Sequence, residues 1–179
     1  MVDEDLRAWH AGVSSWEGNT DVNSRSIGIE IHNPGHADGY PDFPSAQMAS
    51  VVALSRDIIA RHNINDRRVL GHSDVAPGRK VDPGEKFDWR HLHAQGVGHW
   101  VQPAPIRPGP VVCRGDTGHD VTTLQAQLRQ YGYGLEVSGT YDRATATVVA
   151  AFQRHFRPAL VDGVADLSTR ETLLRLLDE

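Results

Sequence analysis

The amino-acid sequence predicts two domains of different fold class, an α/β domain over residues 1–100 and an all-α domain over residues 113–179. In residues 26–32, isoleucines alternate with smaller or polar residues, a pattern typical of a half-buried β-strand. A helical pattern over residues 45–63 and a short apolar segment at 67–70 follow. The C-terminal part instead carries a repeated motif that predicts helix starts, so no sheet is expected there.

The expected strand at residues 26–32 places three isoleucines on one face and Gly28 and Glu30 on the other. If the isoleucines pack against a helix, Glu30 is free to line a cleft, with Gly28 leaving room for a substrate. The alternative is a solvent-facing carboxylate on an amphipathic strand. The alternation by itself does not distinguish the two.

Residues 45–63 are expected to form a helix, because their apolar residues recur at a spacing that places them on one side of it. Residues 67–70 are expected to form the next strand. The apolar positions of this helix are Met48, Val51, Val52, Ile58 and Ile59. A strand, helix and strand of this length suggest a parallel crossover, and ligands collect at the carboxyl ends of such strands. His72 stands at that position. Residues 87–97 are expected to form the last helix of the domain.

The loop over residues 71–84 is rich in Pro and Gly and holds His72, Lys80 and Asp82. Mixed nitrogen and oxygen ligation suits zinc, so a loop that folds back could bring the imidazole and the carboxylate onto one Zn²⁺ ion. Lys80, two residues before Asp82, would face the same cavity in an extended segment. A surface loop whose His and Asp only cap turns remains the alternative.

Residues 101–112 form a linker, because four prolines there prevent a regular helix or a central strand. In the C-terminal domain, residues 139–145 and 163–169 share the spacing Gly-x-x-Asp-x-x-Thr, and residues 120–123 repeat its second half. Each Asp can cap a helix N-terminus. Three helices are therefore expected to begin near Val121, Arg143 and Leu167.

Composition excludes some classes of function. The formal charge of −5 and the scattered Lys and Arg residues argue against a nucleic-acid partner. No apolar run reaches the length of a membrane span. Cys113 is the only cysteine, which excludes an internal disulfide. We expect a monomer.

Three motifs occur in an order that resembles the zinc-dependent N-acetylmuramoyl-L-alanine amidases of the type 2 family. They are residues 8–12 (Ala-Trp-His-Ala-Gly), residues 26–30 (Ser-Ile-Gly-Ile-Glu) and the loop over residues 71–84. The resemblance implies a mixed sheet with flanking helices for the N-terminal domain. It also implies that Trp9 faces the substrate and that His10 lies near the pocket as a substrate-facing or structural residue.

The resemblance further implies the roles of four residues. His72 and Asp82 would bind Zn²⁺, Glu30 would act as general base, and Lys80 would stabilise the oxyanion. A catalytic zinc normally takes three protein ligands and a water.

Members of the family carry a further histidine ligand upstream of the Trp-His-Ala-Gly motif, which here begins at Ala8. We therefore expect the N-terminal domain to be an incomplete copy of the family fold that lacks one zinc ligand. His10, His32 and His36 are the alternative candidates for that ligand.

The C-terminal domain resembles the small peptidoglycan-binding domain found beside many wall hydrolases. The resemblance rests on the two repeats and on the pairs Leu124-Gln125, Gly132-Tyr133, Phe152-Gln153 and Asp162-Gly163. The alternative is that these residues only cap and fill a three-helix core.

The function expected from both resemblances is hydrolysis of the amide between N-acetylmuramic acid and L-alanine in peptidoglycan or muropeptides. Two other classes remain open: a peptidoglycan-binding module without activity, and a zinc peptidase that cuts the stem peptide. The cell envelope, specifically the periplasm, is the expected location, with the cytoplasm as alternative.

Overall fold

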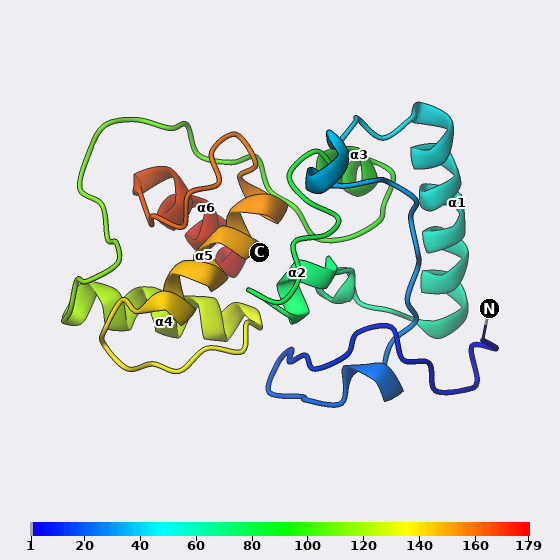
Figure 1. Cartoon of the computed structure of the whole chain (residues 1–179), viewed down its shortest axis with the longest axis horizontal. Helices are drawn as coiled ribbons and strands as arrows, with labels where there is room; N and C mark the ends of the chain where they lie inside the picture. The colour runs from blue at the N-terminus through cyan, green and yellow to red at the C-terminus, as the bar shows by residue number, and fades with distance from the viewer. Residues whose placement is uncertain (1) are drawn as a thin grey trace.

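The computed structural model describes residues 2–179, and Figure 1 shows two groups of helices side by side. The first group consists of α1 (Ser45–His62), α2 (His72–Val75) and α3 (Trp89–Ala94). The second consists of α4 (His119–Tyr131), α5 (Arg143–Phe156) and α6 (Leu167–Asp178). Three short 3₁₀ helices lie at Val22–Ser24, His36–Asp38 and Asp66–Arg68.

The prediction of a mixed sheet in the N-terminal domain is wrong, because residues 2–179 contain isolated β-bridges but no β-strand. Residues 26–32 are extended but irregular, and residues 66–68 form a 3₁₀ turn where a strand was expected. A strand exists only when its backbone N–H and C=O groups pair with a neighbouring strand. No segment of the described chain pairs with residues 26–32, so the alternation of isoleucines produces no sheet.

Helix α1 forms as its apolar pattern predicts, one residue shorter than expected. It ends at His62, and the following residue, Asn63, caps it with a left-handed backbone (φ 51°, ψ 50°) and an N–H that donates to the carbonyl of Ile59. Its buried face packs with the segment around α3 in one cluster. The members of that cluster are Met48, Val51, Val52, Phe87, Trp89, Leu92 and Val97.

Two of the three C-terminal helices begin where the repeat predicts. The carboxylate of Asp142 accepts from the N–H of Thr145 at 2.8 Å, and that of Asp166 accepts from the N–H of Thr169 at 2.7 Å. Helix α4 differs, because it starts at His119 with Gly118 as its N-cap. Asp120 therefore lies in the first turn and does not cap the helix.

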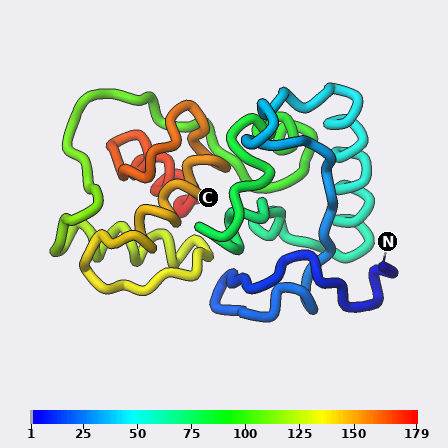
Figure 2. Tube along the Cα trace, viewed as in Figure 1, coloured from blue at the N-terminus to red at the C-terminus, as the bar shows by residue number. Residues whose placement is uncertain are grey.

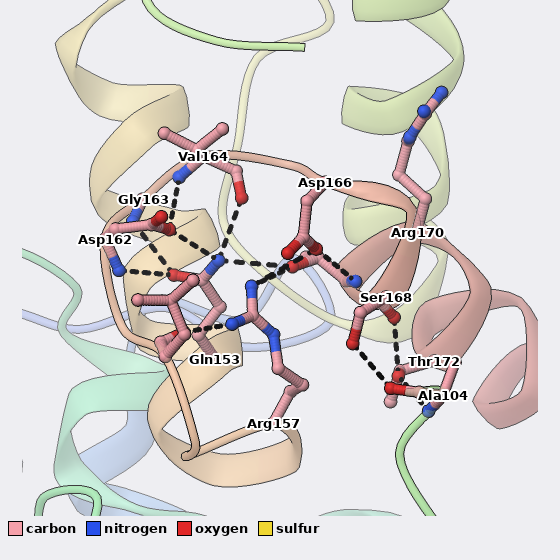
Figure 3. Close-up of polar contacts among 12 residues, drawn as sticks. Ala104, Gln153, Arg157, Asp162, Gly163, Val164, Asp166, Ser168, Arg170 and Thr172 are labelled. Carbon is pink, nitrogen blue, oxygen red and sulfur yellow. Dashed lines mark hydrogen bonds and ion pairs between the residues drawn. The ribbon is translucent and has the colours of Figure 1, made fainter. Parts of the chain in front are cut away.

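A buried glutamine organises each repeat. The side-chain oxygen of Gln153 accepts from the N–H groups of Asp162 (3.0 Å) and Gly163 (2.9 Å). Its amide nitrogen donates to the carbonyl of Val164 at 2.9 Å, as Figure 3 shows. Gln125 makes the equivalent bond to the N–H of Gly139 at 2.9 Å. The repeat in the sequence therefore corresponds to a repeated set of hydrogen bonds, and a fully buried glutamine amide forms each set.

The largest apolar core spans both groups of helices. Trp16, Val75, Ala76 and Val101 belong to the same buried cluster as the apolar faces of α4, α5 and α6. Figure 2 shows the blue N-terminal segment reaching from beside α1 to the end of α4, where Trp16 bridges to Tyr133. The two halves are packed together by shared apolar surface.

The proline-rich residues 101–112 lie against α6. The N–H of Ala104 donates to Thr172 Oγ1 at 3.0 Å, and its carbonyl accepts from Ser168 Oγ at 2.6 Å (Figure 3). This segment is therefore tied to the C-terminal helices. Within residues 2–179, none of the helices is both long enough and apolar enough to cross a membrane.

Candidate functional site

The predicted zinc loop folds back on α2, which is a single turn that begins at His72. The N–H of Ser73 donates to the carbonyl of Asp82 at 2.9 Å, which fixes the end of the loop beside the start of the helix. The turn between them closes through the N–H of Lys80, which donates to the carbonyl of Ala76 at 3.0 Å. Gly78 takes a positive φ of 80° in that turn, a conformation that favours glycine.

This fold brings the imidazole and the carboxylate together. His72 Nδ1 lies 3.0 Å from Asp82 Oδ2, and His72 Nε2 lies 3.1 Å from the carbonyl oxygen of Ala11. The imidazole is mostly buried, with 20% of its side chain exposed, whereas the Asp82 side chain is 57% exposed. One nitrogen and one oxygen donor therefore meet at the surface of the loop.

Two donors do not make up a complete catalytic zinc site. Among residues 2–179, no group of three or more His, Cys, Asp or Glu side chains is placed to hold a metal ion. A catalytic zinc normally takes three protein ligands. Of the alternative ligands, His10 Nε2 contacts Ser26 Oγ at 2.7 Å and His36 Nε2 contacts Glu85 at 3.1 Å, while His32 is exposed.

The structure does not connect the two other predicted catalytic residues to this pair. Glu30 is exposed, and within the described residues no hydrogen bond or ion pair joins its carboxylate to His72, Lys80 or Asp82. Lys80 is half-buried on the same loop as Asp82. Their catalytic roles stay predictions.

His10 links the first two motifs of the sequence. Besides its contact with Ser26, its ring lies so close to Gly28 that a Cβ there would be 2.7 Å from the ring. Glycine at position 28 is therefore needed for the approach of the imidazole, a reason different from the substrate space that the sequence suggested. Trp9 is 79% exposed, and the guanidinium of Arg7 lies 4.3 Å from the centre of its ring.

Sequence reasoning missed Arg79, which joins the first motif to the loop. Its Nε donates to the carbonyl of Val13 at 3.1 Å, and its Nη2 donates to the carbonyl of Ala11. The same Nη2 lies 3.4 Å from His72 Nε2. Arg79 also lines a cavity of about 740 Å³ together with Trp9. Nothing in the local spacing identified this cation, because the two carbonyl groups that accept its hydrogen bonds lie more than sixty residues away in the chain.

Comparison with known proteins assigns both parts of the chain to families. Residues 1–85 match the family described as N-acetylmuramoyl-L-alanine amidase. Residues 117–173 match a putative peptidoglycan binding domain, in the words of that family's description.

The chain is similar to three individual proteins, AmiD, AmpDH3 and AmpD. The amidase AmiD of Escherichia coli is 38% identical over 184 aligned positions, which cover 100% of this chain and 66% of AmiD. A solved structure of AmiD, in complex with the substrate anhydro-N-acetylmuramic acid-L-Ala-D-gamma-Glu-L-Lys, superposes with a TM-score of 0.84 over 99% of this chain and 71% of that one. The structure of AmpDH3 from Pseudomonas aeruginosa is 35% identical, with a TM-score of 0.83 over 99% and 71% of the two chains.

The 1,6-anhydro-N-acetylmuramyl-L-alanine amidase AmpD of Enterobacter cloacae is 44% identical over 90 residues, 50% of this chain and 46% of AmpD. The chain thus spans just under two thirds of the AmiD sequence and less than half of AmpD. The resemblance predicted from the three motifs and the C-terminal repeat is confirmed. This chain belongs to the N-acetylmuramoyl-L-alanine amidase family and carries a peptidoglycan-binding domain of the matched type at its C-terminal end.

Proposed function

We propose that the protein to which this chain belongs hydrolyses the amide bond between N-acetylmuramic acid and L-alanine in muropeptides. The observation that carries the proposal is the contact between His72 Nδ1 and Asp82 Oδ2, in a loop that lies within the part matched to the amidase family. Two similar proteins support the choice of substrate, because AmiD and AmpDH3 have been solved with anhydromuramyl peptides.

In this proposal, Glu30 takes a proton from the attacking water and delivers it to the leaving amine of L-alanine. Lys80 donates to the carbonyl oxygen as negative charge develops on it. The C–N bond breaks, and the lactyl carboxylate of the muramic acid and the free L-alanine amine are the products. We assign no step to a metal, since residues 2–179 bring together only two metal donors, His72 and Asp82.

The direct test incubates the chain, in buffer containing Zn²⁺, with anhydro-N-acetylmuramyl tripeptide and identifies the products by mass spectrometry. Release of the intact tripeptide with a free L-alanine amine supports the amidase, and cleavage between its amino acids would instead indicate a peptidase. The variant His72→Ala should abolish the reaction. His91→Ala is the matched control, because this histidine is exposed on α3.

A second candidate function is binding to peptidoglycan without hydrolysis. It is favoured by the match of residues 117–173 to the peptidoglycan-binding family and by a metal-donor pair that lacks a third member among residues 2–179. Co-sedimentation with insoluble peptidoglycan, combined with the absence of products in the first test, would support this candidate. Products without co-sedimentation would support the enzyme alone.

Zinc is the proposed metal of the family reaction, and His72 and Asp82 are the proposed ligands in this chain. A pair of protein ligands leaves most of the coordination sphere to water, so we expect weak binding of Zn²⁺ by the chain. Titration against a chelating indicator measures the affinity. Tight stoichiometric binding that disappears in His10→Ala would show that His10 completes the site.

We also propose a monomer that works in the cell envelope, where peptidoglycan lies. Light scattering coupled to gel filtration tests the first statement. Fractionation of cells that express the natural gene tests the second, and recovery in the cytoplasmic fraction would contradict it.

A further inference from the structure

Asp74, two residues after His72, carries a carboxylate that is completely buried between the two halves of the molecule. Its Oδ2 accepts from the N–H of Gly71 at 2.7 Å and lies 2.7 Å from His155 Nδ1. Its Oδ1 accepts from the hydroxyl of Tyr133 at 2.8 Å. Gly71 belongs to the predicted catalytic loop, whereas Tyr133 and His155 belong to the C-terminal domain.

Both partners from the C-terminal domain are buried among other rings, Tyr133 against Trp16 and His155 against Trp89 and Phe156. Burial, together with the neighbouring Asp74 carboxylate, raises the pKa of Tyr133 well above its ordinary value, so the hydroxyl remains a donor at neutral pH. The ring of His155 stacks on Trp89 of α3 and on Phe156, with ring centres 3.8 Å apart in both cases. The donors that face Asp74 therefore cannot turn away without loss of packing.

Helix α2 depends on such external support, because it has only four residues. Isolated helices of this length do not form in water, since nucleation fixes several residues for a single hydrogen bond. The N–H of Gly71, which bonds to Asp74, directly precedes His72, and the N–H of Ser73 holds the backbone of Asp82. A restraint on the first turn of α2 is therefore a restraint on both predicted ligands.

We propose that Asp74, held by Tyr133 and His155, is a positioning residue for His72 and Asp82, so that the C-terminal domain supports the loop of the amidase site. The inference rests on the proposed function for the roles of His72 and Asp82. It gives the C-terminal domain a task in the reaction besides any contact with peptidoglycan.

The test compares Tyr133→Phe with Tyr131→Phe in the full chain. Each variant removes one buried hydroxyl from the same core, because the hydroxyl of Tyr131 lies 2.9 Å from His99 Nδ1 and the ring is 3% exposed. Of these two tyrosines, only Tyr133 donates a hydrogen bond to Asp74. The two variants should therefore lose similar global stability and differ in their effect on α2.

The measurements are amide hydrogen exchange at Gly71 and Ser73 and the ring ¹⁵N shifts of His72, by NMR without substrate or metal. Loss of one hydrogen bond to a buried carboxylate should accelerate both amides about 5- to 15-fold in Tyr133→Phe and shift the His72 ring signals. Tyr131→Phe should leave these amides and signals as in the wild type, once its change in global stability is subtracted.

A second variant, His155→Phe, keeps an aromatic ring between Trp89 and Phe156 but removes the donor, and it should reproduce the effect of Tyr133→Phe. Equal acceleration in the Tyr131 and Tyr133 variants, or an unchanged His72 signal in both Asp74-facing variants, would overturn the proposal. Since no turnover is measured, this outcome is independent of whether the chain hydrolyses a muropeptide.

Discussion

Trp16→Ala tests whether the two halves of the molecule unfold as one unit. Trp16 comes from the N-terminal part, is 6% exposed and packs edge-on against two rings of the C-terminal part. The ring centres lie 6.0 Å from Tyr131 and 5.1 Å from Tyr133. The N–H of Glu17 also donates to the carbonyl of Gly132 at 2.8 Å.

The expected loss follows from these contacts. Truncation of a buried Trp to Ala costs about 3–5 kcal/mol. Among the described residues, the buried indole Nε1 of Trp16 has no hydrogen-bond partner, so its removal returns about 1 kcal/mol of that loss. The net decrease in the free energy of unfolding is about 2–4 kcal/mol, a large part of the roughly 5–15 kcal/mol available to a domain. For a chain of this size it lowers Tm by about 4–16 °C.

The assay is urea unfolding followed by tryptophan fluorescence and by circular dichroism at 222 nm. Trp89 lies in the N-terminal core and stacks on His155, so fluorescence reports on that core and its contact with the C-terminal part. The signal at 222 nm comes from all the helices, and α4, α5 and α6 supply the larger part of it. Both midpoints should decrease together. Trp16→Phe is the control and should stay within about 1–2 kcal/mol of the wild type, since it keeps an edge-on ring. A fluorescence midpoint that moves while the helical transition stays in place would refute the shared core.

Three further changes probe other parts of the structure. Gly28→Ala should displace the His10 ring, because the new Cβ would lie 2.7 Å from it; unchanged His10 NMR signals would contradict this contact. Burial lowers the pKa of His99 below 6.5, so the folded state favours the neutral ring. Above pH 6.5 this histidine should leave the free energy of unfolding unchanged. Below it, the unfolded chain takes up a proton that the folded ring does not, so the free energy of unfolding should fall by at most about 1.4 kcal/mol per pH unit. His99→Gln should flatten this part of the stability profile in urea titrations at several pH values. Gln153→Leu should cost about 2–4 kcal/mol in urea unfolding, since it removes a fully buried amide and leaves the N–H groups of Asp162 and Gly163 and the carbonyl of Val164 without their side-chain partner. The exposed Gln130→Leu should cost less than about 0.5 kcal/mol, and equal losses would show that the buried amide is not needed.

The local signals in the sequence were sufficient for most helices. These signals act between residues three or four positions apart, so they can be recognised in the sequence alone. They are the apolar spacing of α1 and the N-caps Asp142 and Asp166 of α5 and α6. The motifs around His72 and Asp82 were likewise sufficient to identify the family, and the loop that joins them brings the two side chains into contact.

Tertiary structure decided the rest. Residues 26–32 have the alternation of a strand, yet a strand needs a paired neighbour, and that neighbour cannot be read from the segment itself. The bond between Asp74 and the N–H of Gly71 is local, because only three positions separate the two residues. The two other partners of Asp74, Tyr133 and His155, lie 59 and 81 residues away in the chain. Local patterns determined which helices form and which chemistry the loop carries, whereas contacts between distant residues decided what holds that loop in place, because no short-range pattern encodes a long-range partner.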